Sequence, residues 1–77
     1  MEINEFIENF ASQFDDTDAS VFNVDTVFHD LDEWSSLVGL SLIAMIDDEY
    51  GVTIKGDELR AAKTVADVYK LVNSKIR

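Results

Sequence analysis

Apolar residues recur at steps of three and four in the first fifteen positions, which is the spacing of one face of an α-helix. The residues concerned are Ile3, Phe6, Ile7, Phe10 and Phe14. This pattern predicts a helix over residues 3 to 15. Glutamates at its start suit the positive end of the helix dipole.

Residues 36 to 50 predict a second helix, because Gly39 is their only strong helix breaker and Gly51 follows where a left-handed C-cap residue is expected. Apolar side chains cover almost every direction around this segment. A helix of that kind lies at the centre of a core or presents an extra apolar face to a ligand or partner.

The last third of the chain predicts two more helices. A short one is expected at residues 58 to 62, and a longer one begins at Thr64 in T-V-A-D, a capping-box pattern with Asp67 in the place of Glu. Apolar residues then follow at steps of three and four: Val65, Val68, Tyr69, Val72 and Ile76. The V-T-I stretch at 52 to 54 is the one segment that predicts brief strand pairing.

Asp15 to Ser35 predict a long connection whose scattered apolar residues hold it against the helices, with one or two short helical turns. His29, the only histidine, is expected to be a solvated residue of this loop. The fold class is therefore all-α: a small four-helix bundle with three main helices, a short third helix and a long first loop. We expect residues 1 to 77 to form one domain.

Composition limits the classes of function. The chain has 77 residues, no cysteine and a net charge of −10, so disulfides are excluded and binding to nucleic-acid phosphates or anionic lipid is disfavoured. Its acidic start does not resemble a secretory signal, and no apolar stretch reaches the ~20 residues that span a bilayer. We expect a cytoplasmic monomer without membrane insertion.

The charge is also uneven along the chain. Residues 1 to 34 hold ten acidic residues and no lysine or arginine, whereas residues 35 to 77 hold six acidic and all six basic residues. The excess of negative charge therefore lies wholly in the first part.

Enzymatic and metal-binding sites find little support. A hydrolase built on His29 would need a nucleophile, an orienting group and an oxyanion hole in a very small domain. A calcium loop beginning at Asp16 fails, because Val21 stands where Gly is required and Val27 where Glu is required. We therefore expect no catalytic residue and no bound metal.

The most informative stretch is D-L-D-E-W-S-S-L-V-G-L-S-L-I-A-M-I-D-D-E-Y-G-V at residues 30 to 52. It resembles the acyl carrier protein family, which has a loop ending in Asp-Leu, a Ser-Leu pair at a helix start, aliphatic residues, an acidic cluster and an aromatic residue. T-V-A-D-V-Y at 64 to 69 and the order of predicted helices extend the resemblance over nearly the whole chain.

The resemblance implies a carrier without enzymatic activity that bears covalent 4′-phosphopantetheine on Ser36. It also implies docking on a phosphopantetheinyl transferase and on acyl-processing enzymes with basic surfaces. The expected contacts are Leu37 and Leu40 beside the serine and the acidic residues Asp47, Asp48 and Glu49, while Ser41 occupies a position where the family often has another acid.

Two features near the serine depart from the family pattern: the residue directly before it, and an extra residue between Asp30-Leu31 and the attachment site. Ser35 stands where the family usually has Asp, so Ser35 is a minor alternative attachment site, and either serine would suit the N-cap of the helix. Independently of the family, a phosphodiester at a helix N-terminus would meet unpaired backbone N–H groups. Trp34 is expected to anchor the long loop in the core, with contact to the arm as the alternative.

The implied function is an acyl carrier for fatty acid synthesis or a related acyl pathway. Dedicated carriage of amino acid or polyketide intermediates is one alternative. A second alternative is an unmodified acidic helical module that binds a basic protein, since Ser35 replaces the usual Asp.

Overall fold

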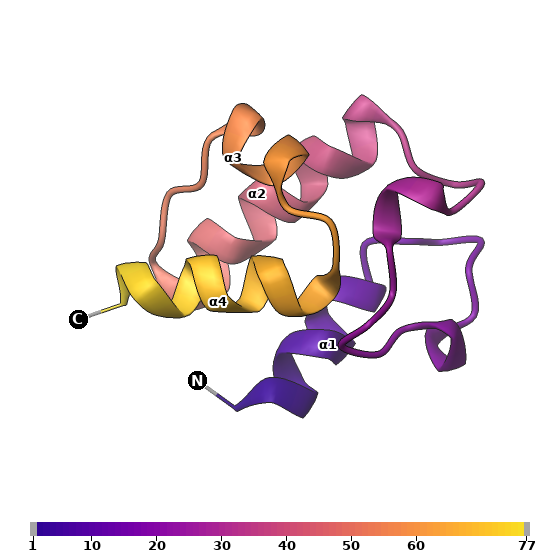
Figure 1. Ribbon diagram of the computed structural model, residues 1–77, viewed down its shortest axis with the longest axis horizontal. Coiled ribbons are helices and arrows are strands. Elements are labelled where there is room, and N and C mark those ends of the chain that lie inside the picture. The colour runs from indigo at the N-terminus through magenta and orange to yellow at the C-terminus, as the bar shows by residue number, and fades with distance from the viewer. Residues whose placement is uncertain (1, 77) are drawn as a thin grey trace.

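The computed structural model describes residues 2–76, which form four α-helices linked by one long and two short connections (Figure 1). The helices are α1 (Ile3–Ala11), α2 (Ser36–Tyr50), α3 (Gly56–Ala61) and α4 (Val65–Lys75). Within residues 2–76 there is no strand, and the one β-bridge joins Val27 to Thr64. The predicted all-α bundle with a short third helix and a long first loop is confirmed.

Helix α1 is shorter than predicted, because it ends at Ala11 and not at residue 15. The Phe14 amide donates to the Ala11 carbonyl at 2.9 Å, which turns the chain. This turn places the Phe14 ring 5.9 Å from Phe10 and 4.9 Å from Phe22, so Phe14 stays buried without being helical. Its place in the apolar pattern reflects packing and not helix length.

Helix α2 has the predicted bounds, and its end is set by Gly51. The Gly51 backbone adopts a left-handed conformation with φ of 65°, and its amide donates to the Asp47 carbonyl at 2.9 Å. Residues with a Cβ seldom adopt this conformation. The predicted C-cap is therefore confirmed.

Helix α3 begins two residues before the predicted start. The Glu58 carboxylate accepts a hydrogen bond from the Lys55 amide at 2.9 Å, so the helix starts directly after Lys55. The preceding segment 52–54 forms no strand, contrary to the pairing that V-T-I suggested. Val52 and Ile54 are buried, and the Lys75 ammonium donates to the Thr53 carbonyl at 3.3 Å, which ties the segment to α4.

Helix α4 starts with the capping box that the sequence predicted. The Asp67 amide donates to the Thr64 hydroxyl and the Thr64 amide donates to the Asp67 carboxylate, both at 3.1 Å. The Lys63 amide also donates to that carboxylate, at 3.0 Å. These backbone donors lower the pKa of Asp67, because they stabilise its charged form.

The long connection between α1 and α2 contains the short helical turns that were expected, at Ala19–Val21 and Phe28–Asp30. Two backbone hydrogen bonds join it to the start of α4: the Val65 amide donates to Thr26 and the Ala66 amide to Val24, at 3.1 and 3.0 Å. The connection is therefore held in place by α4 as well as by its buried side chains.

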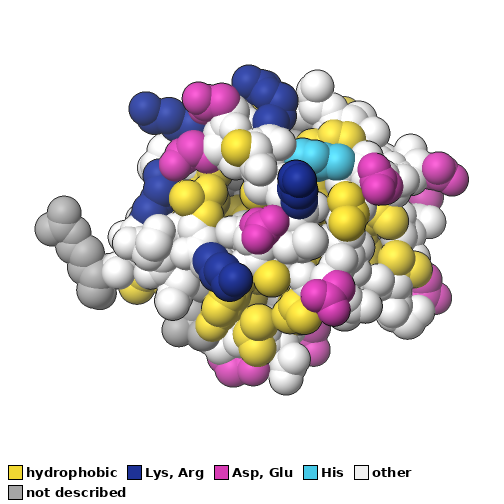
Figure 2. All heavy atoms as spheres, in the orientation of Figure 1, with side chains coloured by type: hydrophobic (Ala, Val, Ile, Leu, Met, Phe, Trp, Pro, Cys, Tyr) yellow, Lys and Arg dark blue, Asp and Glu magenta, His cyan; other side chains and the backbone are white. Residues whose placement is uncertain are grey.

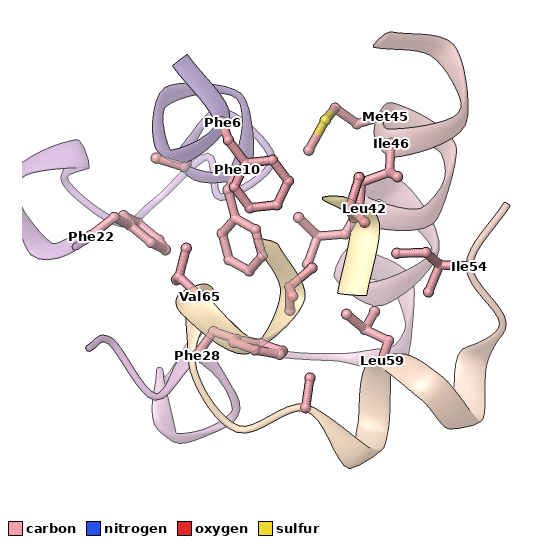
Figure 3. Packing of buried hydrophobic residues seen from close by; sticks show 14 of the residues in the cluster. Phe6, Phe10, Phe22, Phe28, Leu42, Met45, Ile46, Ile54, Leu59 and Val65 are labelled. Carbon is pink, nitrogen blue, oxygen red and sulfur yellow. The ribbon is translucent and has the colours of Figure 1, made fainter. Parts of the chain in front are cut away.

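The core combines two kinds of side chain (Figure 3). Aromatic rings come from α1 and the long connection, where Phe6, Phe10 and Phe28 have no exposed surface. Aliphatic side chains come from α2, α3, α4 and the segment before α3: Leu42, Met45, Ile46, Val52, Ile54, Leu59, Val65, Val68 and Val72. The large rings supply the buried area that a loop lacking regular backbone structure needs.

Basic side chains are confined to one part of the surface, as they are to one part of the sequence. Figure 2 shows one face, on which the visible lysine and arginine side chains lie over the α3 and α4 side, mixed with acidic side chains, whereas only acidic side chains are visible on the side of the long connection. None of the helices within residues 2–76 is both long and apolar enough to cross a bilayer.

Candidate functional site

The start of α2 places two adjacent serines in different roles. Ser35 is the N-cap, with an extended backbone at φ −157° and ψ 168°, and its hydroxyl accepts a hydrogen bond from the Val38 amide at 3.3 Å. Ser36 is the first residue of the helix and its side chain is exposed. Within residues 2–76 the Ser36 hydroxyl has no hydrogen-bond partner. The Ser35 side chain therefore caps the helix, and the Ser36 hydroxyl remains accessible.

The first turn of α2 is open to an anion. It contains no acidic residue, whereas α1, α3 and α4 each have at least one. The amides of a first helical turn lack intrahelical acceptors and carry the positive end of the dipole. A negatively charged group on Ser36 would lie against these donors without a competing carboxylate from the same turn.

A hollow of about 220 Å³ opens beside Ser36, between α2 and α3. Its walls are mainly apolar, and they combine residues from three segments of the chain: Trp34, Ser36, Gly39, Leu40, Ile43, Gly56, Leu59 and Arg60. The only charged side chain in this lining is Arg60.

Trp34 links this hollow to the core. Its ring lies 5.2 Å from Phe28 in an edge-on arrangement, which confirms the expectation that Trp34 anchors the loop. A Cβ added to Gly39 would lie only 3.3 Å from the Trp34 ring, so the glycine allows the indole to approach α2 closely. The same ring lines the hollow. One side of Trp34 therefore anchors the loop, while the ring also lines the hollow into which an arm attached to Ser36 would extend.

Two large apolar side chains on α2 are exposed near the serine. Leu37 is 74% exposed and Leu40 is 63% exposed, although both are good candidates for burial by composition alone. Helical geometry puts both within a little more than one turn of Ser36. The structure thus leaves a small apolar patch beside the serine.

The acidic residues predicted for partner docking lie at the opposite end of the helix. Asp47, Asp48 and Glu49 are exposed and border an open hollow together with Ser41 and Gln13. Leu37 and Asp48 are eleven residues apart, which is roughly 16 Å along a helix. The apolar and acidic contacts therefore form two separate patches on α2.

His29 is half-buried, so the expectation of a solvated loop residue holds only in part. Its ring lies 4.3 Å from Phe28 and 4.7 Å from Trp34, and its Nε2 atom is buried without a hydrogen-bond partner within residues 2–76. The two aromatic neighbours cover part of the His29 ring, and the rest of the residue stays exposed. Within the described residues, no group of three His, Asp or Glu side chains could hold a metal ion.

Arg60, Gly56 and Leu59 were not identified as site residues from the sequence. They come near Ser36 only because α3 packs against α2, and their own segment shows no recognisable motif. Only the folded chain shows that Arg60 is the single charged side chain in the hollow, so no signal in the sequence identifies it.

Comparison with known protein families gives a match over most of the chain. A family model for the phosphopantetheine attachment site matches residues 5–72, which includes all of α2, α3 and the hollow beside Ser36. Neither the curated proteins nor the solved structures yield a match to this chain.

Proposed function

This chain belongs to the phosphopantetheine attachment family, and from that premise we propose that it carries acyl groups as thioesters on an arm bound to Ser36. The covalent cofactor of the family is 4′-phosphopantetheine. We place this carrier in fatty acid synthesis or a related acyl pathway. The observation that supports the site best is the accessible Ser36 hydroxyl at an uncharged helix start.

Ser36 is favoured over Ser35 by the division of roles between them. The Ser35 hydroxyl is engaged by the Val38 amide, and moving it would uncap α2. An Asp at this position would cap the helix in the same manner. The replacement of Asp by Ser35 therefore preserves the helix start, and it lends little support to an unmodified interaction module.

The position of Ser36 also suits the product of modification. A phosphodiester attached there is an anion at the N-terminus of a fifteen-residue helix. Backbone N–H groups and the dipole stabilise an anion at such a position. The carrier itself then contributes no nucleophile, since the thiol at the end of the arm holds the acyl group.

Partner docking is assigned to the two patches on α2. Leu37 and Leu40 would insert into a partner next to the serine, while Asp47, Asp48 and Glu49 would meet lysine and arginine on the partner. Exposed charges of this kind mainly raise the rate of encounter and make it sensitive to salt. The partners are a phosphopantetheinyl transferase and enzymes that load, modify or unload acyl groups.

Attachment is tested by intact mass. Incubating the unmodified protein with coenzyme A and a phosphopantetheinyl transferase should add the mass of one phosphopantetheine. Ser36→Ala should abolish the addition, and Ser35→Ala should retain it. An addition that survives Ser36→Ala would overturn the assignment, and the absence of any addition to the wild-type protein would favour the unmodified module.

The cargo is tested separately. Once the arm is in place, loading with purified acyl-activating enzymes and reading the acyl mass would show whether fatty acyl, polyketide or amino acid units are accepted. Acceptance of amino acids alone would replace the fatty acid pathway by a dedicated amino acid carrier.

A further inference from the structure

The hollow beside Ser36 differs in charge from the rest of this acidic protein. Three other surface hollows are bordered by carboxylates, among them Asp47 in one, Asp32 in another and Asp67 in the third. The hollow that contains Ser36 has no acidic side chain in its lining and one cation, Arg60. With 16 acidic against 6 basic residues in the chain, such a site is unexpected from composition.

Arg60 is available for a new partner. Within residues 2–76 the ion pair between Lys75 and Glu58, at 3.0 Å, is the only one present, so Arg60 is not committed to a carboxylate. An arginine keeps its charge at all ordinary pH values, and its planar guanidinium forms two parallel hydrogen bonds with phosphate oxygens. Arg60 is thus suited to an anion that enters the hollow.

We propose that Arg60 binds the phosphodiester of the arm on Ser36 and holds the first part of the arm in this hollow, against the Trp34 ring. The inference rests on the attachment proposed above. A phosphate on the Ser36 oxygen would lie at the edge of the same hollow that Arg60 lines. Arg60 is then a positioning residue, and α3 contributes to holding the arm.

The small volume of the hollow favours the first part of the arm as its occupant over a long acyl chain. Its volume of about 220 Å³ is below the roughly 300 to 1,000 Å³ of pockets that enclose a whole small molecule. Leu59, which lines it, is almost fully buried, so the hollow is shallow at that point. The apolar walls suit the methyl-bearing segment that follows the phosphate in 4′-phosphopantetheine.

A second anion could in principle reach Arg60, namely a carboxylate at the end of an acyl group. The phosphodiester is favoured because it is fixed to Ser36 itself, whereas an acyl carboxylate lies at the far end of a flexible arm. The phosphodiester and an acyl carboxylate are both anions that a guanidinium can bind. The experiment therefore compares protein with the bare arm and protein loaded with a dicarboxylic acyl group.

Trp34 provides the readout, because it is the only tryptophan in the chain. The protein is first converted to the form that carries the arm, and conversion is verified by intact mass. We expect the tryptophan emission to shift on conversion of the wild type. Arg60→Gln should lose more than half of that shift. Arg60→Lys should show a shift between those of the wild type and Arg60→Gln, since lysine keeps the charge but cannot form two parallel hydrogen bonds with the phosphate.

The matched control is Lys63→Gln, which removes the same charge from an exposed residue outside the hollow and should shift like the wild type. Phosphorus NMR of the arm should show the same order, with the phosphodiester resonance unchanged in Lys63→Gln, changed in part in Arg60→Lys and changed most in Arg60→Gln. In 1 M salt, where the Debye length is about 3 Å, the difference between wild type and Arg60→Gln should shrink. Circular dichroism of each unmodified variant verifies that it is folded.

Failure of this inference is distinct from failure of the attachment proposal, which would appear as no added mass. With the mass added, an equal emission shift and an equal phosphorus resonance in wild type and Arg60→Gln would overturn the role of Arg60. An Arg60-dependent change that occurs only after loading with a dicarboxylic acyl group would overturn the phosphodiester assignment in favour of the acyl carboxylate.

Discussion

Helix α2 differs from the other helices in the charges at its ends. Acidic residues in the first turn and basic residues in the last complement a helix dipole. Helices α3 and α4 follow this rule at both ends, and α1 follows it at its start, through Glu5, Asp57, Glu58, Arg60, Asp67 and Lys75. Helix α2 has no acid in its first turn and no base in its last. It ends instead on Asp47, Asp48 and Glu49.

This difference sets the ends of α2, to which the proposed function assigns binding, apart from helix ends whose charges favour the helix. Each unfavourable charge at a helix end typically costs about 0.3 to 1 kcal/mol at an exposed site. Three acids at the C-terminal end of α2 therefore work against its stability, and a first turn without acids gives up a favourable interaction. Both features are explained if α2 presents its start to a phosphodiester and its end to basic partners.

Removing the three acids at the end of α2 is expected to have the largest effect. The triple variant Asp47→Asn, Asp48→Asn, Glu49→Gln should lower the association rate with the transferase about tenfold or more at low salt, since steering by surface charge is worth 10- to 1,000-fold. The free energy of unfolding should rise by about 1 kcal/mol, because charges that oppose the dipole are gone. Stopped-flow binding and urea denaturation measure the two quantities.

A control with the same change in net charge is available in the long connection. Asp15→Asn, Asp16→Asn and Asp25→Asn also remove three exposed acids, none of them on α2. This variant should leave the association rate within about two- to threefold of the wild type. If both triple variants slowed association equally, net charge and not the acidic patch of α2 would steer the partner.

The elements set by local signals were predictable from the sequence. The bounds of α2, the left-handed Gly51 and the Thr64–Asp67 capping box were all predicted, because each depends on residues within one or two turns. The end of α1 was not, since Phe14 continues the apolar spacing after the helix has stopped. Spacing reports which side chains are buried, and it reports helix length only indirectly.

The candidate site was predictable only in part, for a similar reason. Ser36 and the residues along α2 form one continuous segment, so their spacing already places them together. Arg60 lies 24 positions further along the chain and meets the hollow through the packing of α3 on α2. His29 is half-buried and not fully solvated, which the sequence did not predict, because a lone histidine in a polar loop gives no sign of the Phe28 and Trp34 rings that contact it.

Loss of the capping residues at the start of α4 should lower the free energy of unfolding, whereas loss of the acids at the end of α2 should raise it. Thr64→Ala removes the cap of α4 and should lower the free energy of unfolding by about 1 kcal/mol. Asp67→Asn should also destabilise the protein at neutral pH. Because the folded-state pKa of Asp67 is lowered from 3.8, its contribution is fully present above that pH and is lost as the pH falls through the folded value.

Urea denaturation between pH 7 and pH 2 measures this effect. The difference between wild type and Asp67→Asn should be largest near neutrality and should diminish below pH 3.8. Asp48→Asn in α2 serves as the comparison and should be stabilising at pH 7. Destabilisation by both substitutions would remove the distinction between the two helices.

The smallest expected effect concerns the open start of α2. Ser36→Asp places a permanent anion where the arm's phosphodiester is proposed to lie, and should raise the free energy of unfolding by about 0.3 to 1 kcal/mol relative to Ser36→Asn, which has the same shape without the charge. The gain should vanish in 1 M salt, as screening predicts. Thermal and urea unfolding of the two unmodified variants measure it. Equal stability of the two variants at low salt would show that the first turn of α2 does not favour an anion, and the contrast between α2 and its neighbours would then rest on the acids at its other end.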